Sequence, residues 1–129
     1  MAAATDRSAL RRAAERRGRR AEELAVWLLR LKGYRLLARR YKTGVGEIDL
    51  VVRRGRTVAF VEVKSRATMD EASDAATPAV RRRIARAAGH WLARNPAAAE
   101  WTLRFDVIML APGRLPRHLM AAFDGEGAA

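Results

Sequence analysis

The stretch GEIDLVVRRGRTVAFVEVKSR, residues 46–66, decides the fold that this sequence predicts. Two apolar segments, Glu47 to Arg53 and Thr57 to Ser65, are rich in β-branched residues and flank the turn sequence RRGRT. Gly55 in that turn can take a positive φ, so the pattern predicts a β-hairpin. Both strands also carry carboxylates, and burying such charge needs a physical reason.

The alternation of side chains along a strand predicts which of these groups share a face. On the first strand, Glu47 and Asp49 share one face, and Ile48 and Leu50 share the other. On the second strand, one face holds Val58, Phe60, Glu62 and Lys64. With a loop of two or four residues, Asp49 shares the face of Glu62 and Lys64, and a four-residue loop pairs Asp49 directly with Glu62. A loop of three or five residues would separate them.

Asp49, Glu62 and Lys64 predict a site for metal-assisted phosphodiester hydrolysis. Two carboxylates about 5 Å apart repel each other unless a cation lies between them. Carboxylate oxygens and waters are the ligands that Mg²⁺ prefers, and Lys64 can hold a water or stabilise a phosphate. The alternative is an ion pair between Glu62 and Lys64 on a solvated face, although the apolar flank VAFV makes a solvated face less natural.

Composition predicts a single domain with a polyanionic partner. The chain has 129 residues, of which 50% are hydrophobic, and its 26 basic against 14 acidic residues give a formal charge of +12. Nucleic acid is favoured over a membrane because no apolar run approaches the length of a membrane span. The 23 Arg against 3 Lys also fit a GC-rich coding bias. With no cysteine and no apolar signal-peptide core, we expect a cytoplasmic protein, and a homodimer stays open.

Two amphipathic helices are predicted on either side of the hairpin. The first runs from about residue 19 to 32 and stops at Gly33. The second has Thr77 as N-cap and Pro78 at its first position, and it ends before Asn95. The stripes expected to face the core are Ala21, Leu24, Ala25, Leu28 and Leu31 in the first helix, and Val80, Ile84, Ala87, Ala88, Trp91 and Leu92 in the second.

Three further segments complete the expected sheet. YRLLARRYK, residues 34–42, predicts a weak strand, and His118 to Phe123 a short strand or a helical turn. In Trp101 to Leu110, strict alternation predicts one buried face and leaves Asp106 on the polar face, where it can pair with an Arg. The predicted order of one helix, three strands, one helix and one or two strands indicates an α/β domain with a mixed central sheet flanked by helices. Residues 1–17 form a basic, partly flexible extension, and residues 124–129 a flexible tail.

Asp49 with Glu62, Val63 and Lys64 matches the D…(D/E)-x-K signature, so the sequence resembles the PD-(D/E)xK, restriction-endonuclease-like superfamily. Ile48 stands where the superfamily name has Pro. More closely, GRRAEELAVWLLRLKGYRLLARRY, GEIDLVV, FVEVKSR and RFDVIML, in this order, resemble the YraN family of bacterial proteins. The match runs from Gly18 to about Phe123.

The resemblance implies an endonuclease-like domain over residues 18–123 and a Mg²⁺- or Mn²⁺-dependent nuclease acting on DNA. The implied metal ligands are Asp49, Glu62, the backbone carbonyl of Val63 and Glu22, with Glu23 as the fallback for Glu22. Lys64 is the implied catalytic lysine. The alternative function is a nucleic-acid-binding module whose site is vestigial or needs a partner.

Arginines near the predicted site and on the second helix allow two interpretations, whereas one role is favoured for the tryptophans and histidines. The candidate phosphate contacts are Arg40 and Arg66 beside the site and Arg81, Arg82 and Arg83 on the polar side of the second helix, all of which also fit a solvated face. We expect Trp27, Trp91 and Trp101 to pack in or beside the core. His90 and His118 have no metal-ligand spacing, so surface or capping roles are expected.

Overall fold

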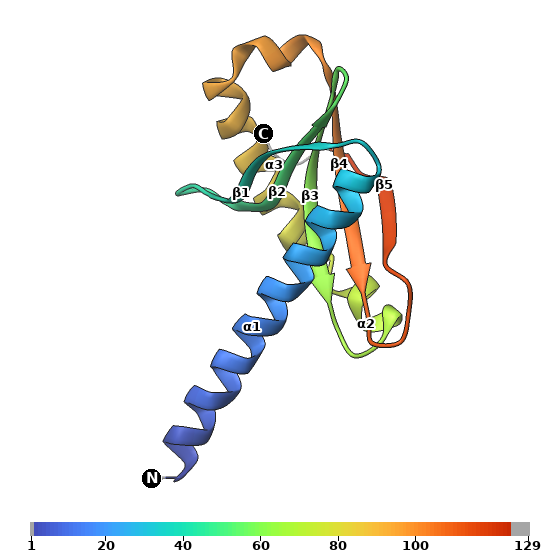
Figure 1. Ribbon diagram of the computed structural model, residues 1–129. Coiled ribbons are helices and arrows are strands. Elements are labelled where there is room, and N and C mark those ends of the chain that lie inside the picture. The colour runs from blue at the N-terminus through green and yellow to red at the C-terminus, as the bar shows by residue number, and fades with distance from the viewer. Residues whose placement is uncertain (1, 125–129) are drawn as a thin grey trace.

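The computed structural model of the protein describes residues 2–124, so the tail expected beyond Asp124 lies outside the described residues. Its centre is one sheet of five strands in the order β1-β2-β3-β4-β5 (Figure 1). The strands are β1 (Arg35–Lys42), β2 (Glu47–Arg54), β3 (Thr57–Ser65), β4 (Thr102–Leu110) and β5 (Arg117–Phe123). Only β3 and β4 pair in parallel, so the expected mixed sheet is confirmed.

The hairpin of β2 and β3 forms as predicted. Arg54 pairs with Thr57, which leaves a two-residue turn of Gly55 and Arg56. Gly55 takes φ 60°, a left-handed conformation that glycine adopts without steric cost.

A long connection joins β3 to β4 because parallel neighbours need a crossover. It contains α2 (Met69–Asp74), α3 (Pro78–Arg94) and the 3₁₀ helix η1 (Pro96–Glu100). The expected start of α3 is confirmed, since Thr77 Oγ1 accepts from the Val80 amide at 3.3 Å and Pro78 follows it. The sequence pattern missed α2 and η1, both of which are shorter than two helical turns.

Helices cover both faces of the central strands. On one face α1 (Ala2–Leu31) packs on the sheet, and on the other α3 does (Figure 1). The α1 side buries Ala21, Ala25, Val26, Leu29, Leu50, Val52, Ala59 and Val61, and the α3 side buries Ile84, Ala87, Ala88, Trp91, Val51, Val58 and Phe60. The paired strands β2 and β3 therefore lie between two hydrophobic layers.

The first helix differs from its prediction in its start and in its buried face. It begins at Ala2 and includes most of the basic extension. Leu24 and Leu31 are 57% and 83% exposed, whereas Leu29 is 1% exposed and Val26 is also buried. Several sets of residues in this helix satisfy helical spacing, and contact with the sheet selects the one with Ala21 and Ala25 at its centre.

Strand β4 is buried on both faces, not on one. Met109 and Val107 pack against Ala72 of α2, and Ile108 packs in the α1 layer. Asp106 is fully buried, because β5 forms a strand beside it rather than a helical turn. The prediction that Asp106 lies on a polar face of β4, opposite a single buried face, is therefore wrong.

Asp106 lies in a polar network that satisfies its carboxylate. The guanidinium of Arg104 donates to both carboxylate oxygens at 2.8 Å, and His118 Nε2 lies 2.8 Å from Oδ2. The Ala121 amide donates to Oδ1 at 3.1 Å. Burial alone raises the pKa of Asp106, but the hydrogen bonds from His118, Arg104 and Ala121 outweigh it, so the pKa is lowered. The expected Arg partner is confirmed, whereas the expected surface position of His118 is wrong, since its side chain is buried.

The tryptophans divide between core and surface. Trp91 is buried in the α3 layer, and Trp101 packs beside it under the guanidinium of Arg53 at 3.8 Å. Trp27 is 56% exposed, contrary to expectation, because it lies on the outer side of α1 with Leu24 and Leu31. Within residues 2–124, none of the helices combines the length and the apolar character that crossing a membrane requires.

Candidate functional site

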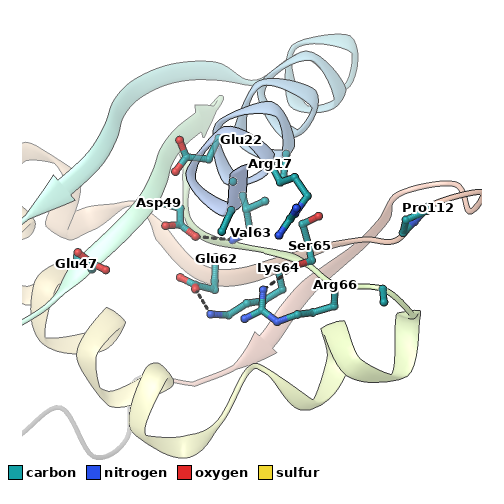
Figure 2. A pocket seen from close by; sticks show the side chains of 14 residues that line it. Arg17, Glu22, Glu47, Asp49, Glu62, Val63, Lys64, Ser65, Arg66 and Pro112 are labelled. Carbon is teal, nitrogen blue, oxygen red and sulfur yellow. Dashed lines mark hydrogen bonds and ion pairs between the residues drawn. The ribbon is translucent and has the colours of Figure 1, made fainter. Parts of the chain in front are cut away.

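A pocket of about 730 Å³ lies between α1 and the ends of β2 and β3 (Figure 2). It brings together all five residues that the sequence predicted for the catalytic and metal site: Glu22 from α1, Asp49 from β2, and Glu62, Val63 and Lys64 from β3. Glu23 does not line this pocket and pairs with Arg39 at 3.1 Å on the surface. Glu22, not the fallback Glu23, therefore accompanies the other carboxylates.

Where the backbone pairing between β2 and β3 ends, the side chain of Asp49 contacts the backbone of β3. The antiparallel ladder runs from Arg54–Thr57 to Leu50–Val61. Beyond it, Asp49 Oδ2 accepts a hydrogen bond from the Val63 amide at 2.8 Å. A two-residue turn is one of the two lengths that predicted a shared site for Asp49 and Glu62, and this part of the prediction is confirmed.

The neighbouring Ile48 departs from the expected alternation. Ile48 packs with Val51 in the α3 layer, whereas Leu50 packs in the α1 layer, so the two residues do not share a face. The pairing of β2 with β3 ends at Leu50, so the ladder that enforces strict alternation does not extend to Ile48.

The loop before β2 approaches the backbone of α3 very closely. A Cβ atom built on Gly46 would lie 1.9 Å from the Arg83 carbonyl oxygen. Thr43 closes the loop, since its Oγ1 accepts from the Gly46 amide at 3.0 Å. Glycine is required here because any side chain would push the start of β2 away from α3.

The carboxyl group of Asp49 has its pKa raised to about 7. Burial is the largest cause, and the charge of nearby Glu62 is the next. The Val63 amide lowers the pKa in part, while the charge of Glu22 raises it further. The charges of Glu62 and Glu22 thus oppose ionisation of Asp49, which is the repulsion expected from the sequence.

Glu62 and Lys64 form an ion pair inside the protein. Lys64 Nζ lies 2.8 Å from Glu62 Oε1, and the side chains are 14% and 11% exposed. The ion pair that the alternative interpretation predicts is therefore present, but it is mostly buried and does not lie on a solvated face. A mostly buried pair of this kind carries a desolvation cost that a surface pair avoids.

Glu22 is held by a cation as well. Arg40 Nε donates to Glu22 Oε2 at 2.8 Å, and the Glu22 side chain is 13% exposed. Among the side chains that the structure describes, no three from His, Asp or Glu are placed to hold an ion together. The donor set still suits Mg²⁺, because it consists of carboxylate oxygens whose mutual repulsion a cation relieves. Glu22 or Glu62 must first exchange its present partner.

The predicted phosphate contacts lie at different places. Arg66 lines the pocket, and Arg40 is linked to it through its ion pair with Glu22. Arg83 lies 3.8 Å from Glu47 at a smaller hollow that also contains Glu62 and Lys64. Arg81 turns away from it, with its Nε donating to the Ala76 carbonyl at 3.0 Å. Arg82 is exposed on α3 and lines neither hollow.

Sequence reasoning missed one basic residue in the pocket. Arg17 belongs to α1 and extends from it toward β3 (Figure 2). It lies four residues before Ala21, which also lines the pocket, so helical spacing was a usable signal. The extension expected over residues 1–17 includes Arg17, whereas the continuous helix α1 brings this residue to the site.

Comparison with known proteins places the chain in a family. The model described as "Uncharacterised protein family UPF0102" matches residues 21–110. A UPF0102 protein of Methylorubrum extorquens (strain PA1) is 58% identical over 122 residues, covering 95% of both chains. One of Parvibaculum lavamentivorans is 60% identical over 111 residues, covering 86% of this chain and 84% of its own. The family match and these identities agree with the YraN-like resemblance, and the chain belongs to the UPF0102 family.

Proposed function

We propose that the protein is a metal-dependent nuclease-like enzyme that hydrolyses phosphodiester bonds in DNA. The observation that carries this proposal is the convergence of Glu22, Asp49, Glu62 and Lys64 in one pocket. The order of a helix, three antiparallel strands, a helical crossover and a parallel strand supports a restriction-endonuclease-like fold. The formal charge of +12 supports a polyanionic substrate.

Asp49, Glu62, the Val63 carbonyl and Glu22 would hold Mg²⁺ or Mn²⁺. The bound ion supplies Lewis acidity, which lowers the pKa of water and offsets charge on the phosphate. The raised pKa of Asp49 reflects burial and the neighbouring charge of Glu62, and a bound cation would offset both.

Lys64 stabilises the reacting phosphate in this proposal. An ammonium group has three N–H donors, and the Glu62 ion pair uses one of them. The others are available to a phosphate oxygen or a water, while Glu62 fixes the direction of the lysine. The low exposure of the pair strengthens its electrostatic effect, because water screens it less.

The test is cleavage of duplex, single-stranded, flap and four-way DNA in Mg²⁺ or Mn²⁺. We expect activity to disappear with EDTA and in Asp49→Asn, Glu62→Gln and Lys64→Ala. Glu71→Gln is a matched control, since Glu71 is an exposed residue of α2 outside the pocket. Full activity in Glu62→Gln would show that the site is assigned to the wrong residues.

The second candidate is a nucleic-acid-binding module with a vestigial or partner-dependent site. The observation in its favour is that Glu22 and Glu62 are each already paired with a cation. This candidate predicts DNA binding in EDTA without cleavage of any substrate in the panel. It also predicts that Glu62→Gln leaves DNA affinity unchanged.

A further inference from the structure

Residues 7–20 of α1 form a basic helical segment, called the rod below, that extends away from the sheet. The buried residues of α1 begin at Ala21, and the preceding turns extend away from the sheet (Figure 1). From Arg7 to Arg20 the helix carries seven arginines, all exposed, against the single acidic residue Glu15. None of the seven forms an ion pair with a carboxylate in the described part of the chain, unlike Arg39, Arg40 and Arg83.

One side of this rod continues the wall of the pocket. Ala14, Gly18 and Ala21 line the pocket, at spacings of four and three residues. Continuing this pattern toward the N-terminus reaches Arg11 and then Arg7, because a helix of 3.6 residues per turn places them on the same side. Arg12 and Arg16 lie on the opposite side of the rod by the same rule.

We propose that this pocket side of α1 binds double-stranded DNA that extends out of the pocket, through Arg7, Arg11 and Arg17. The inference rests on the proposed function, because it takes the pocket as the place where one strand lies. The segment from Arg7 to Arg20 is about 20 Å long, which matches roughly six base pairs of duplex. DNA neutralises the otherwise unpaired charge of this segment.

The rigidity of the two partners favours a duplex over a single strand. Duplex DNA is straight over this length, since its persistence length is about 150 base pairs. Once its backbone lies in the pocket, the flanking turn must run beside the α1 rod. A single strand is free to bend away from it.

An anionic membrane surface fits the same charge less well. A helix that lies on a membrane needs an apolar face opposite its basic one. Between Arg7 and Arg20, Leu10 is the only large exposed apolar residue. The charge distribution therefore favours nucleic acid.

The test measures the salt dependence of binding to a blunt DNA duplex by fluorescence anisotropy, in EDTA. Each phosphate contact contributes about −0.9 to the slope of log K against log salt. Arg7→Ala with Arg11→Ala should flatten the slope by about 1.8, so a fourfold rise in salt weakens this variant about tenfold less than the parent protein. The matched control, Arg12→Ala with Arg16→Ala, removes the same charge from the adjacent turns, on the opposite side, and should leave the slope unchanged.

Four results would overturn the inference. An unchanged slope in the Arg7 and Arg11 variant would show that the rod does not contact DNA, and equal flattening in both variants would show that no side is selected. Tighter binding to phosphatidylserine vesicles than to duplex would identify a membrane surface instead. For a single strand of the same length, we expect a smaller change of slope, and an equal change would reject the duplex.

The inference and the proposed function can fail separately. Binding in EDTA does not depend on cleavage, so an inactive pocket leaves the predicted difference between the two variants intact. Retained cleavage with an unchanged slope overturns only the role of the rod. Both double variants replace exposed helical arginines with alanine, a strong helix former, and circular dichroism checks that α1 persists.

Discussion

Arg40 donates from its Nε to Glu22 Oε2 at 2.8 Å, although its backbone has φ 49°. A residue other than glycine in this left-handed region costs about 1–3 kcal/mol and persists only where the surrounding structure holds it. Arg40 thereby pairs with a carboxylate that lines the same pocket as Asp49. In the proposed function, a phosphate that competes for Arg40 would free Glu22 to bind the metal ion, and this would couple DNA binding to completion of the proposed metal site.

Arg40→Ala should therefore increase the response of the free protein to Mn²⁺. Without its guanidinium partner, Glu22 adds a free carboxylate to the pocket, and a tenfold gain in metal affinity corresponds to about 1.4 kcal/mol of extra stabilisation. Thermal melts with and without Mn²⁺ measure this extra stabilisation. Arg39→Ala is the control, because Arg39 pairs with Glu23 outside the pocket. Equal Mn²⁺ shifts in the two variants would argue against the coupling.

Asp49→Asn should change how stability depends on pH. The pKa of Asp49 is about 7 in the folded protein against 3.8 without perturbation, so the folded state binds more protons between these values. Stability contributed by this group is present below about pH 4 and is lost as the pH rises to 7, by at most about 1.4 kcal/mol per pH unit.

Urea unfolding across this pH range measures that effect. Asn keeps an oxygen for the Val63 amide but cannot ionise, so the variant should lose the slope and be more stable than the parent at pH 8. Asp74→Asn, on the exposed end of α2, controls for removal of one negative charge. A slope that survives in Asp49→Asn would assign it to another group.

Asp106→Asn should strongly destabilise the protein at neutral pH. Removing the charge from a fully buried, paired carboxylate leaves Arg104 uncompensated and typically costs about 3–5 kcal/mol. Because the pKa of Asp106 is lowered, its contribution is present above its unfolded pKa, near 4, and is lost as the pH falls through the folded value. Denaturant unfolding from neutral to acidic pH should show the parent and variant converging. A constant difference would contradict this account.

Gly46→Ala should destabilise the start of β2. The added Cβ meets the Arg83 carbonyl oxygen at 1.9 Å, so the backbone must move, at a cost of about 1–3 kcal/mol. Gly44→Ala is the matched control two residues away, because nothing lies within 4 Å of its Cβ position. Denaturant unfolding should separate the two variants, and equal stability would show that the loop yields without cost.

Local sequence determined the elements whose signals lie within a few residues. The turn at Gly55 and the cap at Thr77 were predictable because each depends on backbone conformation and hydrogen bonds inside its own segment. The turn length in turn set the register that brings Asp49 to Glu62. Asp49, Glu62 and Lys64 were therefore within reach of sequence reasoning, whereas Glu22 followed from the family resemblance and Arg17 was missed.

Tertiary structure alone decided which groups are buried and what holds them. Helical spacing allowed both Leu24 and Leu29 to face the core, and contact with the sheet buried only Leu29. Asp106 is buried because β5 lies beside β4, and Glu22 is paired because Arg40 reaches it from β1. These outcomes depend on residues far apart in the chain, whose packing and desolvation no local pattern encodes.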